Sequence, residues 1–209
     1  MVKIKKKRKV LIITFSVCFT VNLSLVVLFN GWVNLGKYSV YYAQHLPHKA
    51  GTNPVMVAVF NNLDAIYIPN ANYNVPFGGA EVKTTKDTIS YFFEPLKASY
   101  IYVEKSSTAD PTLVFEQSRS SNYVYCIKNI TDGYSYSYYF TGKGELKAKT
   151  KALYTYTSYD EIACPLIKQD FSQIKFFQNE LYGTIVAHRQ IPKINLQWIY
   201  NLLNERKFN

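Results

Sequence analysis

The 209-residue chain carries 24 Lys and Arg against 14 Asp and Glu, a net charge of +10, and 16% of its residues are aromatic. This length fits one folded domain with a short appendage. Six of the basic residues lie within residues 1–9, so residues 10–209 keep a net charge of only +4, with 18 basic and 14 acidic residues. Because the basic cluster directly precedes an apolar segment, the sequence argues against nucleic-acid binding.

The apolar segment covers residues 10–29, from Val10 to Phe29, and contains no charged side chain. Twenty helical residues rise about 30 Å, which matches the hydrocarbon core of a bilayer. Basic residues 3–9 precede it, and the next charged residue is Lys37. The positive-inside rule then predicts a cytoplasmic tail over residues 1–9 and a single transmembrane anchor over residues 10–32, in contact with the lipid bilayer along residues 10–29.

A cleaved signal peptide is the competing prediction for this segment. Signal peptides have a shorter apolar stretch and a small-residue cleavage site, and residues 30–34 (NGWVN) offer no such site. Frequent Lys, Asn, Ile and Tyr indicate an AT-rich, bacterial genome. We therefore expect a bacterial inner-membrane protein whose C-terminal part is periplasmic or extracellular. Asn22 is a polar residue in the middle of the anchor. Its side chain either contacts another membrane helix or is merely tolerated in the lipid.

Beyond the anchor we expect a connector over residues 33–53 and a folded domain over residues 54–209. Residues 38–44 suggest a first strand. The apolar run PVMVAVF at residues 54–60 suggests a buried strand, which would form a hairpin with residues 65–68.

Regular strand and turn signals follow. Predicted strands cover residues 88–93, 98–104, 112–117, 123–128, 134–141 and 145–157. The strongest hairpin signals are Asp132-Gly133 and the run Gly142-Lys143-Gly144, because glycine adopts positive φ without steric cost.

Helical signals come last. Apolar residues at helical spacing over residues 167–181, followed by Gly183 as the helix stop, predict one helix, and residues 193–207 predict a second. The apolar stripe of the second helix contains Ile194, Trp198, Ile199, Leu202 and Leu203. Strands first and helices last indicate an α+β fold: a transmembrane helix, then an antiparallel β-rich domain with two C-terminal helices.

Two cysteines lie outside the anchor, Cys126 and Cys164. In an oxidising compartment they predict one disulfide; two buried thiols are the other possibility. Tyr134, Tyr136 and Tyr138 share one face of a predicted strand, with Ser135 and Ser137 on the other. The three tyrosines form either an exposed interaction face, or a buried row beneath the 193–207 helix with Trp198 against them. Burial is the favoured arrangement.

No cofactor, metal or catalytic site is predicted. The chain resembles membrane-anchored sortases only in its N-terminal anchor and β-rich domain. Their Thr-Leu-x-Thr-Cys signature is replaced by residues 160–164 (DEIAC). We expect a non-enzymatic protein-interaction domain that binds another membrane or envelope protein, as an accessory subunit of a pilus, secretion, conjugation or membrane-regulator assembly. An anchored hydrolase or peptidase and a glycan-binding module are the alternatives.

Overall fold

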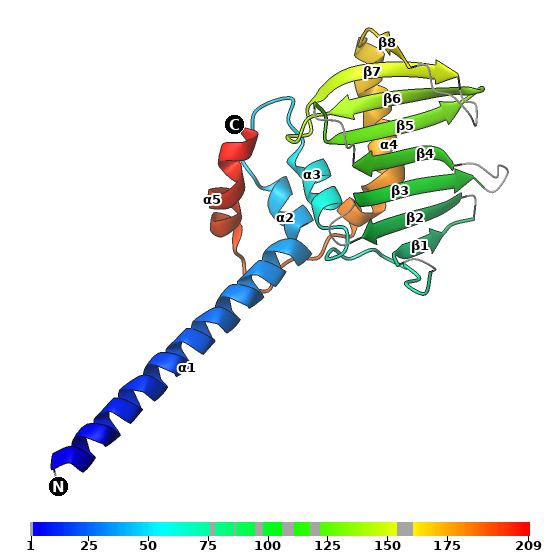
Figure 1. Cartoon of the computed structure of the whole chain (residues 1–209). Coiled ribbons are helices and arrows are strands. Elements are labelled where there is room, and N and C mark those ends of the chain that lie inside the picture. Colours follow the sequence, from blue (N-terminus) through cyan, green and yellow to red (C-terminus); the bar gives the residue numbers. More distant parts are fainter. Residues whose placement is uncertain are drawn as a thin grey trace.

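The computed structural model describes residues 2–75, 78–85, 87–94, 98–105, 111–117, 122–153 and 161–209. The helices are α1 (Val2–Lys37), α2 (Ser39–Gln44), α3 (Pro54–Asn61), α4 (Lys168–Ala187) and α5 (Gln197–Phe208). The strands are β1 (Ala80–Lys83), β2 (Asp87–Glu94), β3 (Ala98–Lys105), β4 (Pro111–Gln117), β5 (Tyr125–Thr131), β6 (Tyr134–Phe140), β7 (Leu146–Leu153) and β8 (Ile162–Cys164). The predicted α+β class is confirmed (Figure 1).

Helix α1 projects from the domain as a single rod (Figure 1). Its Ile13–Lys37 stretch is long and apolar enough to cross a membrane, and none of the apolar window is covered by the rest of the chain. Helices of this kind near an N-terminus occur in membrane anchors and in signal sequences. Thr20, Asn22, Ser24 and Asn30 each bond to the carbonyl four residues back; the Asn22 amide nitrogen lies 2.8 Å from the Cys18 oxygen. The contact of Asn22 with another helix stays a prediction.

The eight strands form one antiparallel sheet in sequence order, β1 to β8. The Asp132-Gly133 hairpin signal is confirmed, because Thr131 pairs with Tyr134 and both intervening residues have positive φ. Gly144, also at positive φ, brings the β6–β7 turn against α3. A Cβ there would lie 2.9 Å from the backbone oxygen of Asn53, so a larger residue would displace the contact.

Helices α3 and α4 cover one face of the sheet, on which the cross-strand row Tyr91, Ile101, Phe115, Ile127 and Tyr138 is buried. Phe60 of α3 is the centre of this core. Its ring stacks on Phe115 and meets Tyr182 of α4 edge-on, with 5.9 Å between ring centroids. The sheet therefore has one face under helices.

Two predicted N-terminal strands are helices instead. Residues 39–44 form α2, and the run at 54–60 forms α3 rather than half of a hairpin with residues 65–68. A short continuous apolar run does not distinguish a buried strand from a buried helix. Here the helix start decides: Pro54 occupies the first turn, and the Asn53 side chain accepts a hydrogen bond from the Met56 amide at 2.9 Å.

The C-terminal helices exist, with changed limits. Helix α4 continues through Gly183 to Ala187, because Tyr182 just before the expected stop and Ile185 beyond it are both buried in the core. Helix α5 begins at Gln197 rather than at residue 193. The predicted strands from 88 to 141 are present within a few residues of their expected limits; residues 154–157 of the last one lie outside the described residues.

Candidate binding surface

The predicted tyrosine row of β6 does not form one exposed face. Tyr138 is 2% exposed, and its ring lies 6.0 Å from Phe177 of α4, while Tyr134 at the far end is 38% exposed. The helix that covers the row is α4, not the C-terminal helix. Trp198 is 68% exposed and has no place against these rings. Both predicted arrangements of the row, exposed face and burial under the last helix, are therefore corrected.

Lysines of β7 line the same side of the sheet. Lys149 Nζ lies 2.7 Å from the Asp170 carboxylate, whose side chain is 1% exposed. The other Asp170 oxygen accepts the Ile167 amide at 2.8 Å, so one carboxylate holds both the start of α4 and a lysine of the sheet. Burial, and then the Asp170 charge, raise the pKa of Tyr138 to about 12. This network joins α4 to the sheet, and we assign it a structural role.

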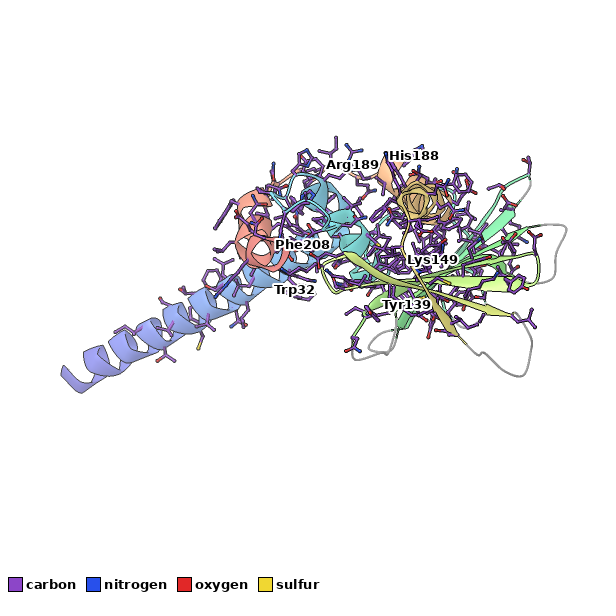
Figure 2. The ribbon with its side chains drawn as sticks, turned by 90° about the horizontal axis from the view of Figure 1, so that it is seen from above. Trp32, Tyr139, Lys149, His188, Arg189 and Phe208 are labelled. Atoms are coloured by element: carbon purple, nitrogen blue, oxygen red, sulfur yellow. The ribbon has the colours of Figure 1, made fainter. Side chains whose placement is uncertain are left out.

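Among the described residues, no helix covers the opposite face of the sheet (Figure 2). Tyr139 lies on that side, while Lys149 lies between the sheet and α4. The strand register places two cross-strand rows on this open face. One row contains Phe92, Tyr100, Glu116, Cys126 and Tyr139, and the other contains Tyr102, Val114, Lys128 and Ser137.

Two aromatic groups lie on the open face, and all their members are half-buried. On β2 and β3, the Tyr102 ring lies 5.4 Å from that of Phe92 and 6.2 Å from that of Tyr100. At β5 and β6, the rings of Tyr123 and Tyr139 lie 5.5 Å apart. The outer face of an antiparallel sheet is normally polar, so these rings depart from the usual pattern.

An ion pair lies between the two aromatic groups. Lys128 Nζ lies 2.7 Å from Glu116, with the side chains 34% and 27% exposed. Burial alone would lower the pKa of Lys128, but the hydrogen bond and charge of Glu116 outweigh it and raise that pKa. Burial also raises the pKa of Tyr102. Both charges are thus partly removed from water and hold each other in place.

A second carboxylate borders the face beside the Tyr139 ring. The Tyr139 hydroxyl donates to both oxygens of Glu161, at 2.9 and 3.0 Å. Thr150 Oγ1 donates to the same carboxylate at 3.2 Å. The β6 serines on this face are buried: Ser135 and Ser137 are 5% and 3% exposed, rather than in water as expected for a buried tyrosine row. We define the open-face surface as Phe92, Tyr100, Tyr102, Glu116, Tyr123, Lys128, Tyr139 and Glu161.

The predicted disulfide is not formed, since Cys126 and Cys164 are both free thiols. Strands β6 and β7 lie between them, so three strand spacings separate their backbones by roughly 14 Å. The register also puts them on opposite faces: Cys126 pairs with Tyr139, and Cys164 pairs with Lys149. A disulfide requires Cα atoms within about 7 Å. Cys126 is fully buried, which raises its thiol pKa to about 12.

A cavity of about 290 Å³ lies between α1, α3 and α5, where Figure 2 shows Trp32 and Phe208. Its lining mixes apolar side chains such as Leu203 with Asn61 and Lys207. His45 and His48 border a separate, open depression, and each ring bonds to a nearby backbone carbonyl. Among the described residues, no three His, Cys, Asp or Glu side chains are grouped as a metal site.

The aromatic residues of the open face were not identified from the sequence. In β2 and β3 both alternating sets contain large side chains, such as Tyr91 beside Phe92, so composition does not show which set the helices cover. Comparison with protein-family models, with curated proteins and with solved structures gave no match. The function must therefore be argued from the geometry of this surface.

Proposed function

We propose that this chain is a membrane-anchored, non-enzymatic binding module that uses its open-face surface to bind another membrane or envelope protein. The observation that carries the proposal is the pair of half-buried aromatic groups on either side of the Lys128–Glu116 ion pair. Aromatic side chains are enriched at the energetic centres of protein interfaces, and a charge pair there acts strongly once a partner removes it from water.

The topology in this proposal is a single pass through a bacterial inner membrane. Helix α1 supplies the span, and the basic residues before it favour a cytoplasmic N-terminus. The sheet then works in the periplasm or outside the cell, as an accessory part of an envelope assembly.

Site-specific photocrosslinking in native cells tests the binding surface. A photoreactive residue in place of Tyr100 is expected to give a discrete protein adduct. The same residue in place of Tyr73, which is 54% exposed in the loop before β1, serves as the matched control. Adding Tyr102→Ser should reduce the Tyr100 adduct severalfold while the melting temperature changes little, because Tyr102 is only half-buried.

Two outcomes would count against a protein partner. Equal adducts at positions 100 and 73 would mean that the open-face surface is ordinary solvent-exposed sheet. A heterogeneous adduct that collapses on glycosidase treatment would favour the glycan-binding alternative, because aromatic rings also stack on sugars. Hydrolase or peptidase activity is not expected, and that expectation remains a prediction.

A further inference from the structure

The C-terminal helix α5 has its apolar and polar sides reversed relative to a normal surface helix. Tyr200 and Phe208 are buried, but the rest of its inner side consists of the half-buried amides of Gln197, Asn201 and Asn204. Its outer side carries large apolar residues: Trp198 is 68% exposed, Leu202 is 75% exposed and Ile199 is half-buried. Leu203 is 58% exposed and also borders the cavity between α1, α3 and α5. An amphipathic helix on a water-soluble domain turns its apolar stripe inward.

Specific contacts hold α5 in this orientation. Gln197 Nε2 donates to the Tyr42 carbonyl at 2.9 Å and lies 2.7 Å from the Asn201 side-chain oxygen. The Tyr200 ring stacks on Tyr42, with 5.4 Å between ring centroids. Rotating α5 to bury Trp198 would break both contacts with Tyr42, the hydrogen bond from Gln197 and the stacking of Tyr200. The outward apolar stripe is therefore a fixed feature of the fold.

The segment before α5 extends the apolar surface. Ile191 is 72% exposed and Ile194 is 69% exposed. We call Ile191, Ile194, Trp198, Leu202 and Leu203 the α5 patch. Contiguous exposed apolar residues on a soluble domain mark a site that contacts another protein or a membrane.

The α5 patch begins beside the end of the membrane-spanning candidate helix. Asn34 of α1 lies 3.4 Å from the Ile194 carbonyl, and its side-chain oxygen accepts the Tyr42 hydroxyl at 2.6 Å. Asn34 is five residues beyond Phe29, a rise of about 7.5 Å. The headgroup layer on each side of the hydrocarbon core is roughly 5–7 Å thick. The Ile194 carbonyl is thus near the outer edge of the headgroup layer, and Figure 1 shows α5 on the side of the domain from which α1 projects.

The charge around the patch suits an anionic lipid surface. Residues 187–209 contain four basic residues and a single acidic one, Glu205. The basic residues are Arg189, Lys193, Arg206 and Lys207, and all four are exposed. A helix with Trp and Leu on one side and basic residues beside them is typical of segments that lie in the membrane interface.

We infer that the α5 patch lies in the interfacial layer of the same bilayer that α1 crosses, as a second, peripheral membrane contact of the domain. A lipid layer over the outer side of α5 explains why its amides face inward and its Trp and Leu side chains face outward. It also explains why the segment leading into α5 lies close to the headgroup layer. The inference rests on α1 spanning the bilayer and is independent of what the open-face surface binds. With two contacts the domain has a fixed orientation on the membrane.

The chain contains two tryptophans, Trp32 and Trp198, so fluorescence can report on each. The full chain carrying Trp32→Phe is reconstituted in phosphatidylcholine–phosphatidylglycerol vesicles, with and without bromine on the lipid acyl chains. Trp198 emission is expected to be blue-shifted and quenched by the brominated lipid. Trp198→Phe leaves Trp32 as the positive control near the end of the anchor. Water-like, unquenched Trp198 emission beside a quenched Trp32 would overturn the inference.

Variants separate lipid contact from other causes of a blue shift. Ile194→Ser with Leu202→Ser should reduce Trp198 quenching severalfold, whereas Phe171→Ser, at a 60% exposed position on α4, should leave it unchanged. Blue-shifted emission without bromine quenching would mean burial against protein, and a shift that disappears on dilution into excess lipid would mean contact with a second copy of the chain. Either result contradicts lipid contact. Tyr102→Ser should not alter Trp198 quenching, so the two proposals fail independently.

Discussion

Replacing Asp170 with alanine should destabilise the domain strongly, because this one carboxylate serves both α4 and β7. The variant loses the hydrogen bond to the Ile167 amide at the start of α4, about 1 kcal/mol. It also leaves Lys149, whose side chain is 13% exposed, without its counter-charge. Removing one member of a buried pair costs about 3–5 kcal/mol. The neighbouring Tyr136 and Tyr138 rings, 5.6 and 5.5 Å from Lys149 Nζ, stabilise the ammonium in part and favour the lower end of that range.

The expected total is about 4 kcal/mol of the free energy of unfolding. For a domain of this size it lowers the melting temperature by roughly 8–16 °C. Circular dichroism of the full chain in detergent measures the change. Lys147→Met is the matched control: its side chain is 53% exposed and lies 3.8 Å from Glu145, so its loss should cost less than about 0.5 kcal/mol. A cost of Asp170→Ala no larger than that of Lys147→Met, or additive costs of Asp170→Ala and Lys149→Met, would show that this carboxylate does not serve both elements.

In the folded full chain, Cys164 should react with a thiol reagent, whereas Cys126 should be protected until the chain unfolds. Peptide mapping of the labelled protein measures both. Protection of both cysteines in unfolded, non-reduced protein would instead indicate a disulfide. Burial raises the pKa of Tyr125 and Tyr200 to about 12. As the pH rises, these two hydroxyls therefore ionise first in the unfolded chain, and the free energy of unfolding should fall between about pH 10 and 12. An unchanged urea midpoint between about pH 9 and pH 11 would contradict this. A reporter active only outside the cytoplasm, fused after Asn209, should be active, and activity of a cytoplasmic reporter there would reverse the proposed topology.

The strands from β2 to β7 could be located from sequence because local signals sufficed. Turn residues such as Asp132-Gly133 mark the strand limits, and side chains between them alternate. Strands β1 and β8 are short, with four and three residues, and lacked that signal. Helix α3 was predicted as a strand although the sequence contains a helix N-terminus signal, Asn53 followed by Pro54. The continuous apolar run after Pro54 was given more weight than this signal.

The candidate binding surface was less predictable than the fold. Alternation shows that Tyr134, Tyr136 and Tyr138 share a face but not which element covers it. That depends on α4 crossing the sheet, a contact between residues far apart in the chain. The same limit applies to Cys126 and Cys164, whose separation in sequence allowed a disulfide although two intervening strands prevent it. Helix α5 was expected to bury its apolar stripe, and the polar docking through Gln197 and Tyr42 reverses its orientation.

The order of the sheet has a consequence for how the chain folds. Every strand pairs with its neighbour in sequence, so the sheet can assemble hairpin by hairpin from β1 to β8 as the polypeptide emerges. The base of the domain cannot assemble in this stepwise way, because its early residues contact the end of the chain. Tyr42 stacks on Tyr200, which lies within the last ten residues, and the Phe208 carbonyl accepts a hydrogen bond from the Lys49 amide at 3.0 Å. A chain that stops before α5 would therefore present a finished sheet on an open base, a target for proteases that remove incompletely folded proteins.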